Sequence, residues 1–301
     1  MIKSVTVTNP KNESLVLELR EPETPGLYIK SIDGLGPPKA TINTTELASV
    51  DGGLFSSSRI TERNIVITLG MMWSPTIEAA RLRTYKYFPI KKEVRILVET
   101  DNRKAEAVGR VESHDPNIFS NQETTQISII CPDPFFYEVG NEETVFSGVA
   151  PVFEFPFSNE SLDENLIEFG DIHLDTRAVL NYVGDVDTGI RITIHALDTV
   201  RNITLYNTQT FEQMAISTDK IRALTGRPFA AGDDIVLNTI RGQRFARLLR
   251  DGTYINIISA INKNADWFQL SNGDNIFTYT AAEGEKAVQV SFFYRNAYGG
   301  V

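Results

Sequence analysis

A proline-bounded junction near the middle of the chain most constrains how this sequence can fold. The apolar run 126–130 is followed by Cys131 and then by the segment 132–134, which reads Pro-Asp-Pro, and three aromatic residues occupy 135–137. Proline has no backbone N–H and biases the residue before it toward extended geometry, so this segment cannot continue a central strand or lie inside a helix. We therefore interpret it as the boundary between two folded units, residues 1–137 and 138–301. A loop within one large domain is the alternative.

Length and composition are those of a two-domain globular protein. A chain of 301 residues can bury two cores of ordinary size. Hydrophobic residues make up 42% and charged residues 23%, which excludes a disordered chain, and no apolar run reaches the roughly 18 residues that a membrane-spanning helix needs. Residues 1–10 show no secretory signal. The single cysteine cannot form an internal disulfide, so we expect folding in a reducing cytoplasm without membrane insertion.

The first half of the chain predicts a β domain with one helix. Its apolar and polar residues alternate with the period of strands. The runs with this pattern are 4–8, 14–19, 26–32, 40–47, 59–69, 94–99, 106–112 and 124–130. A helix is predicted between them, with Ser74 as its N-cap, Pro75 at its first position, Glu78 in its first turn and Pro89 at its end.

The segment 48–58 between two of these predicted strands is small and flexible in composition apart from its apolar residues. A long hairpin with such a tip serves a neighbouring molecule more often than its own core. We therefore predict contacts between subunits at Val50, Leu54, Phe55 and Arg59. A disordered surface loop is an equally good interpretation of the same residues.

The second half predicts a β-sandwich or jelly roll. Tight-turn dipeptides such as Gly184-Asp185 and Asn272-Gly273 separate many short apolar runs, which is typical of these folds. The predicted core strands are 190–194, 203–206, 235–238, 245–249, 254–258 and 288–294. A short helix is expected at 218–224, ending at Gly226.

A search for chemistry finds two weak candidates. Asp171, His173 and Asp175 would share one face of a strand and could hold a divalent ion, although a solvated strand face explains them better. Trp267 and Asn275 have the aromatic and amide groups that stack on and bond a sugar, although a strand entering a turn is the better explanation. No phosphate-binding loop, zinc-ligand spacing or nucleophile elbow occurs. We expect that the protein is not an enzyme and that it binds no metal ion and no cofactor.

Motifs along the whole chain resemble the distal tail protein family of phages with long, non-contractile tails. In the first half they are the segments 51–55, 63–65, 117–120 and 126–136. In the second half they are Asn181 with 184–185, then 231–233 with 238–239 and Gly242, and finally 273–275. Each motif is weak alone, and their order and spacing together carry the resemblance.

The resemblance implies a structural protein of the virion. Family members have an amino-terminal β domain with one helix that assembles into a six-fold ring, and a carboxy-terminal domain similar to galectins or carbohydrate-binding modules. The implied partners are five further copies, in one ring or in stacked rings, the tail tube protein, a tail-associated or spike protein, and receptor-binding proteins. A net charge of −10 would let DNA pass a central channel without being bound.

Two competing functions remain open at this point. A soluble carbohydrate-binding protein, whose second domain adheres to cell-surface saccharide, is the main alternative. An unrecognised hydrolase is a weaker one, because no catalytic residues can be nominated for it. A six-fold particle with a central hole would favour the ring protein, and a monomer retained by glycans would favour the lectin.

Overall fold

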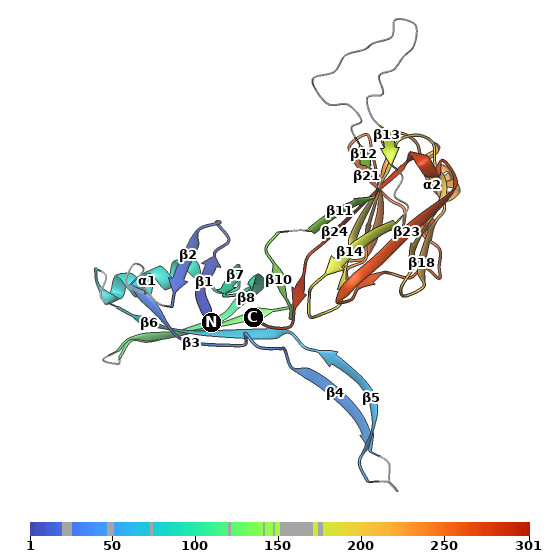
Figure 1. Ribbon diagram of the computed structural model, residues 1–301. Coiled ribbons are helices and arrows are strands. Elements are labelled where there is room, and N and C mark those ends of the chain that lie inside the picture. Colours follow the sequence, from blue (N-terminus) through green and yellow to red (C-terminus); the bar gives the residue numbers. More distant parts are fainter. Residues whose placement is uncertain are drawn as a thin grey trace, which may run out of the picture. The chain divides into compact units, whose positions relative to one another are not determined.

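The computed structural model describes residues 1–19, 26–46, 51–72, 75–119, 122–140, 142–146, 148–150, 171–173 and 177–301, and for 142–173 it describes the backbone alone. The chain forms two compact units, and each is considered by itself (Figure 1). Unit 1 comprises Met1–Val139 together with Ala297–Val301, and unit 2 comprises Gly140–Asn296. The ranges expected from the sequence, 1–137 and 138–301, differ from these units mainly at the end of the chain, where the last five residues return to unit 1.

Unit 1 is built on one antiparallel sheet of nine strands in the order β2-β1-β7-β8-β9-β6-β3, with β10 beside β8 and β25 beside β10. Alternate residues of the strands are buried, as in β6, where Ile65, Ile67 and Leu69 are fully buried. The strands are β1 (Ile2–Thr8), β2 (Ser14–Glu18), β3 (Leu27–Asp33), β6 (Arg63–Met71), β7 (Glu93–Thr100), β8 (Lys104–Asn117), β9 (Thr124–Cys131), β10 (Phe136–Glu138) and β25 (Ala297–Tyr298).

Helix α1 (Ile77–Tyr87) packs on the core of unit 1 through Ala80 and Thr84. Its N-cap is Thr76, whose hydroxyl accepts a hydrogen bond from the backbone N–H of Ala79 at 3.1 Å. This corrects the sequence-based start of the helix, because Ser74 lies outside the described residues and the cap is supplied two positions later.

The segment expected to be a flexible loop is largely a strand. β4 (Ala40–Glu46) and β5 (Gly53–Ile60) pair antiparallel as a separate two-stranded sheet, with Ala40 opposite Ile60 and Glu46 opposite Gly53. Only the tip, 47–50, lies outside the described residues. In Figure 1 this hairpin extends away from the rest of unit 1.

Unit 2 is a sandwich of a six-stranded and a four-stranded sheet around one core. The fully buried side chains of Ile192, Leu237 and Phe292 come from the first sheet, and those of Leu205 and Phe277 come from the second. The first sheet is β11 (Glu142–Phe146), β24 (Val288–Tyr294), β16 (Arg191–Ala196), β19 (Asp234–Asn238), β20 (Phe245–Arg250) and β21 (Thr253–Asn256); the second is β14 (Arg177–Tyr182), β23 (Gly273–Glu283), β17 (Arg201–Asn207) and β18 (Glu212–Ile216).

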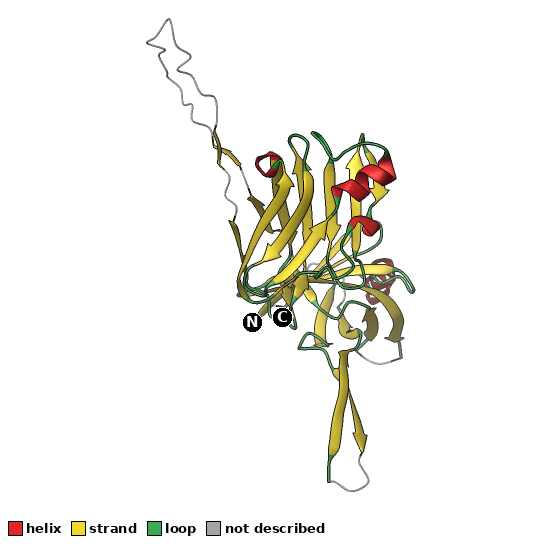
Figure 2. Ribbon diagram, turned by 90° about the vertical axis from the view of Figure 1, so that its right-hand side faces the viewer, coloured by secondary structure: helices red, strands yellow, loops and turns green. Residues whose placement is uncertain are grey.

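Short elements complete unit 2 (Figure 2). Helix α2 (Thr218–Thr225) ends as the sequence predicts, because Gly226 adopts the left-handed conformation with φ of 75° that favours glycine at this position. The remaining elements are the pairs β12 (Gly148–Ala150) with β13 (Asp171–His173) and β15 (Thr188–Gly189) with β22 (Gln269–Leu270), and the 3-10 turns η1 (Ile258–Ala260) and η2 (Glu285–Ala287). The mainly β architecture predicted from the sequence is confirmed.

Candidate assembly surface

The β4–β5 hairpin presents apolar side chains to solvent. Every residue of both strands is exposed. Ile42, Leu54, Phe55 and Ile60 have 64%, 62%, 62% and 45% of their surface exposed. A two-stranded hairpin by itself is at best marginally stable in water, and exposed apolar groups that lie together mark contact surfaces. The hairpin is therefore a candidate for contact with another molecule.

A β-bulge decides which of these side chains share a face. The register steps from Asn43 opposite Ser57 to Thr44 opposite Phe55, which leaves Ser56 as the extra residue. Because residues directly opposite one another point to the same face, Phe55 joins Ile42 and Ile60 on one face of the hairpin.

The opposite face of the hairpin carries Leu54 and Arg59, which lie opposite Thr45 and Thr41. The four residues predicted to contact a neighbouring subunit are thus divided. Phe55 lies on one face, Leu54 and Arg59 lie on the other, and Val50 falls outside the described residues. Ile42 and Ile60, which the sequence interpretation did not select, complete the more apolar face.

Arg63 fastens the base of the hairpin. Its side chain is only 3% exposed and donates four hydrogen bonds to backbone carbonyls. Nε bonds Pro134 O at 2.6 Å, Nη1 bonds Gly34 O at 2.5 Å and Gly36 O at 2.6 Å, and Nη2 bonds Gly299 O at 2.6 Å. Burial lowers the pKa of this guanidinium. One side chain therefore joins the loop before β4, the proline junction and the end of the chain.

Phe136 anchors the proline junction, residues 132–134, to the core of unit 1. Its ring is fully buried and lies 4.5 Å from the Arg63 guanidinium carbon. Within the junction, the Asp133 carboxylate accepts hydrogen bonds from the Phe135 N–H at 3.2 Å and the Tyr137 hydroxyl at 2.8 Å. The stiff proline segment is thus closed on itself and fixed to unit 1.

The end of the chain is held in unit 1 by a second arginine. Arg103 donates to Gly300 O at 3.0 Å, and its guanidinium lies 4.3 Å from the centre of the Tyr298 ring. The Val301 N–H donates to Leu35 O at 3.1 Å. Sequence reasoning missed these contacts, because nothing local in the final residues indicates which part of the chain they bind.

A cleft of about 480 Å³ opens at the base of the hairpin. It lies between the loop that precedes β4 and the turn that joins β5 to β6. Its lining residues are Gly34, Gly36, Pro37, Pro38, Lys39, Thr61, Glu62, Arg63 and Asn64. The lining carries charged and backbone polar groups, and the Arg63 carbonyl contacts form one wall.

The two residues predicted to contact saccharide lie in different environments. Trp267 is half-buried, packs against the core of unit 2, and has the Arg244 guanidinium 5.5 Å from its ring. Asn275 is 3% exposed. Its Oδ1 accepts a hydrogen bond from the Ser271 N–H, and its Nδ2 donates to Ser271 O and Gly273 O. Asn275 therefore shapes the turn before β23 and does not present its amide to a ligand.

The metal candidate receives no support from the part of the chain that is described. Asp171 and His173 lie in β13, where only the backbone is described, and Asp175 falls outside the described residues. No group of three or more His, Cys, Asp or Glu side chains placed to hold a metal ion occurs among the described residues.

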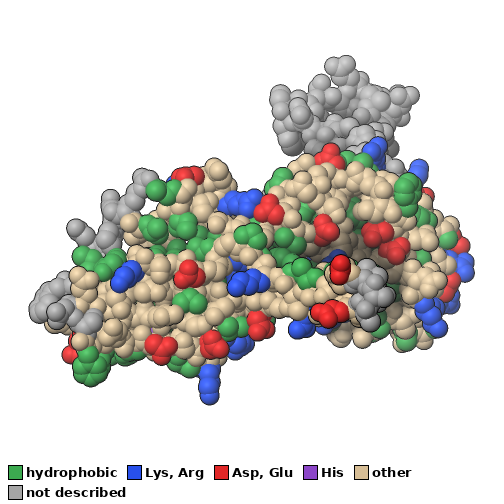
Figure 3. All heavy atoms as spheres, turned by 90° about the horizontal axis from the view of Figure 1, so that it is seen from below, with side chains coloured by type: hydrophobic (Ala, Val, Ile, Leu, Met, Phe, Trp, Pro, Cys, Tyr) green, Lys and Arg blue, Asp and Glu red, His purple; other side chains and the backbone are tan. Residues whose placement is uncertain are grey.

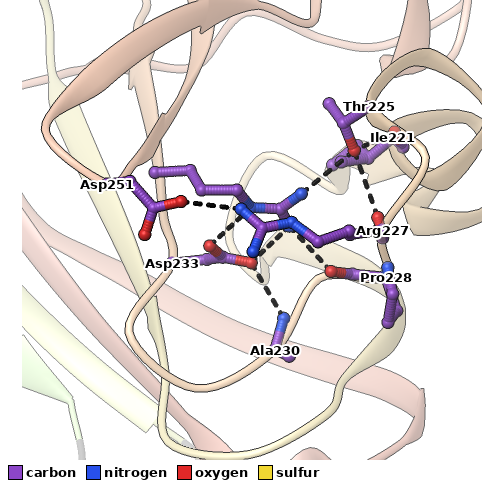
Figure 4. A network of polar contacts seen from close by, with 8 residues as sticks. Ile221, Thr225, Arg227, Pro228, Ala230, Asp233 and Asp251 are labelled. Atoms are coloured by element: carbon purple, nitrogen blue, oxygen red, sulfur yellow. Dashed lines mark hydrogen bonds and ion pairs between the residues drawn. The ribbon is translucent and has the colours of Figure 1, made fainter.

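A buried ion pair in unit 2 has a structural role (Figure 4). The Arg250 guanidinium bonds the Asp233 carboxylate at 2.7 Å and 2.5 Å and also donates to Pro228 O and to the Thr225 hydroxyl. The Ala230 N–H donates to the same carboxylate at 3.0 Å. Burial alone would raise the pKa of Asp233, and the bonds from Arg250 and Ala230 bring it below its usual value. The pair fixes the loop between α2 and β19.

Charges on unit 1 are mixed in sign. In the space-filling view of Figure 3, acidic, basic and apolar side chains alternate over the visible face of this unit. Such a surface lacks the single-signed field that a nucleic-acid groove requires. Among the described residues, neither helix is long and apolar enough to cross a bilayer.

Comparisons with known proteins identify the fold. The chain is similar to the crystal structure of the Dit protein of phage SPP1, described as a paradigm of the hub adsorption apparatus in phages that infect Gram-positive bacteria, with a TM-score of 0.62 and 14% identity over 97% of this chain and 99% of that one. It is also similar to a chain of the phage P2 baseplate in its activated conformation with Ca, with a TM-score of 0.51 and 12% identity over the full length of both. No family model and no curated protein sequence matches it.

The protein therefore has the fold of phage tail-hub proteins across essentially its whole length. The resemblance to distal tail proteins that the sequence motifs carry is confirmed at the level of the fold.

Proposed function

We propose that the protein is a structural subunit of a phage tail tip, and not an enzyme. In this proposal six copies close into a ring, or into stacked rings, which joins the tail tube protein on one side to a tail-associated or spike protein on the other. Receptor-binding proteins attach to the same hub, and DNA passes through the central hole without specific binding. The subunits are made and assembled in the cytoplasm of the bacterial host and end in the virion tail.

The β4–β5 hairpin is the observation that carries this proposal. A ring requires a contact in which one surface of a subunit meets a different surface of the next, and a projecting hairpin supplies such a surface. Ile42, Phe55 and Ile60 share its apolar face. Burial of a large apolar side chain contributes about 1.5–3 kcal/mol, so three such residues per contact would matter for assembly.

The proposal is tested by measuring the size and shape of the purified full chain. We expect light scattering and negative-stain imaging to give a six-fold particle with a central hole. The double variant Ile42→Ser with Phe55→Ser should weaken each contact by about 100-fold or more and release monomer at the same concentration. A chain that stays monomeric at high concentration, alone and with tube and tip proteins, would refute the ring.

Two control variants sharpen this test. Phe211→Ser removes a phenylalanine that is 90% exposed on unit 2 and should leave the particle unchanged. Leu54→Ser removes a residue that is as exposed as Phe55, at 62%, from the opposite face of the hairpin. If Leu54→Ser disrupts the ring and the Ile42 and Phe55 pair does not, the contact uses the Leu54 and Arg59 face.

The alternative of a saccharide-binding protein rests on unit 2 and is independent of the ring. Trp267 and Asn275 favour it little, because the tryptophan is half-buried under Arg244 and the asparagine is internal to a turn. A different group of side chains on the same unit gives the saccharide hypothesis a more definite form.

A further inference from the structure

Four exposed arginines lie in one region of unit 2 without a carboxylate partner. Arg191 is in β16, Arg241 and Arg244 lie in the connection between β19 and β20, and Arg247 is in β20. None of the four forms an ion pair with another described residue, whereas Arg201 elsewhere in the unit contacts both Asp219 and Glu283. The cluster is therefore a local excess of positive charge.

The sheet register places Arg191 and Arg247 on one face, and Arg241 and Arg244 lie in the connection at the end of the sheet where Arg191 lies. Asn238 lies opposite Arg191 on one side and opposite Phe245 on the other, so Arg191 and Phe245 are two strands apart, about 10 Å. Arg247 follows Phe245 by two residues and points to the same side, because the intervening Ala246 is fully buried. We call this group, namely Arg191, Arg241, Arg244 and Arg247, the arginine face.

Aromatic rings support two of the four arginines. The Arg247 guanidinium lies 4.4 Å from the Phe245 ring, and that of Arg244 lies 5.5 Å from the Trp267 ring. Such cation–π contacts contribute about 0.5–1 kcal/mol at exposed sites and do not neutralise the charge. They favour one placement of each guanidinium group, which lowers the entropy cost of binding a ligand.

Polar side chains share this face with the arginines and with the apolar side chains of Val236 and Phe245. Across the sheet, Ser291, Thr193, Val236, Arg247 and Asn256 lie in one row of register partners. Hydroxyl and amide groups in such a row bond hydroxyl-rich ligands, and a dry protein interface would need a larger apolar centre.

The charge of the region contrasts with the charge of the chain. Residues 235–250 contain no Asp or Glu, although the protein has a net charge of −10. Arginine offers planar, paired donors that match carboxylate and phosphate groups. An anionic ligand would thus be recognised by this region and weakly repelled by most of the remaining surface.

We propose that the arginine face binds an anionic saccharide, a sugar polymer that carries carboxylate or phosphate groups. The guanidinium groups bind the acidic groups, and the neighbouring hydroxyl and amide side chains bond the sugar hydroxyls. Trp267 lies at the edge of this face under Arg244, so ligand binding to Arg244 changes the surroundings of the indole. This site does not depend on ring formation.

The test uses the full chain and Trp267 fluorescence as a local signal. A Trp73→Phe variant leaves Trp267 as the sole tryptophan, because the chain has two. The variant is titrated with polygalacturonate, with a glucosylated polyglycerol phosphate, and with neutral dextran of similar length. We expect saturable changes in emission with one or both anionic polymers and none with dextran. The polymer that binds identifies the acidic group.

Matched variants separate the arginine face from general charge effects. Arg244→Gln with Arg247→Gln should weaken binding at least about tenfold, because two charge-assisted contacts are lost. Arg110→Gln with Arg222→Gln removes the same net charge from exposed positions in β8 and α2 and should change affinity less than about twofold. Circular dichroism checks that both pairs fold.

Four results would overturn the proposal. The first is that neither anionic saccharide binds, and the second is that the two pairs of arginine substitutions lower the affinity equally. The third is that polyglutamate binds as tightly as the saccharides at equal charge, and the fourth is that duplex DNA binds more tightly than the saccharides. The third result would identify an acidic protein as the partner, and the fourth a nucleic acid. Light scattering measures ring formation in the same samples, so failure of this site and failure of the ring are distinguished.

Discussion

Replacing Arg63 by methionine should destabilise unit 1 more than any exposed substitution. The side chain is 3% exposed and bonds the carbonyls of Gly34, Gly36, Pro134 and Gly299. A hydrogen bond to a charged group contributes about 1.5–3 kcal/mol, but the loss of the buried charge also removes its desolvation cost. We therefore expect a net loss of about 3–5 kcal/mol in the free energy of unfolding of unit 1.

Urea unfolding of the two units can be followed separately, because Trp267 lies in unit 2 and the fully buried Cys131 lies in unit 1. Labelling of the Cys131 thiol at each urea concentration reports the unfolding of unit 1, since the chain has one cysteine. For a unit of about 140 residues, the expected loss corresponds to roughly 10–20 °C in its melting temperature. Cleavage near the carboxyl terminus by a protease should accelerate, because Gly299 loses its partner.

Two further variants test the reasoning about Arg63. Arg63→Lys keeps the charge but presents its donors from one nitrogen, which cannot reach carbonyls on three separate segments, so about half of the loss should remain. Arg110→Met removes an exposed arginine, 3.3 Å from Glu93, and should cost less than about 1 kcal/mol. If Arg63→Met and Arg110→Met differ by less than 1 kcal/mol in unfolding free energy, the assigned role of Arg63 is wrong.

Three other predictions concern titration, reactivity and the buried ion pair. Burial lowers the pKa of His114, whose Nε2 lies 3.1 Å from the Thr84 hydroxyl. Unit 1 should therefore keep its stability above about pH 6.5 and lose part of it as the pH falls below that value, because the unfolded chain takes up the proton first. The variant His114→Gln should flatten this step when urea unfolding is measured between pH 7 and 5. Burial raises the pKa of the Cys131 thiol to about 11, so an aromatic disulfide reagent at pH 8 should label the native chain far more slowly than the unfolded one, and complete native labelling within minutes would contradict this. Asp233→Asn breaks the buried pair with Arg250 and should lower the free energy of unfolding of unit 2 by about 3–5 kcal/mol. Asp251→Asn breaks an exposed pair with Arg227 and should lower it by less than about 1 kcal/mol. Similar losses in the two variants would show that burial of the first pair does not matter.

The sequence by itself determined the elements whose causes are local. Alternation of apolar residues fixes strands such as β6, because a strand with one buried face needs an apolar residue at every second position. The glycine at 226 fixes the end of α2, and the two prolines at 132 and 134 fix the end of β9. The motifs that resemble distal tail proteins also follow from the order of residues alone, and they led to the correct fold.

Only the tertiary structure decided how distant segments meet. The bond between Arg63 and Gly299 joins residues 236 positions apart, and no local pattern near either residue predicts it. The bulge at Ser56 moves Phe55 to the face of Ile42, which simple alternation would have placed on the other side. The arginine face likewise exists only because β16 and β20 both pair with β19. Local sequence specifies conformation, but pairing between strands is chosen by the whole core at once, and the candidate surfaces depend on that pairing.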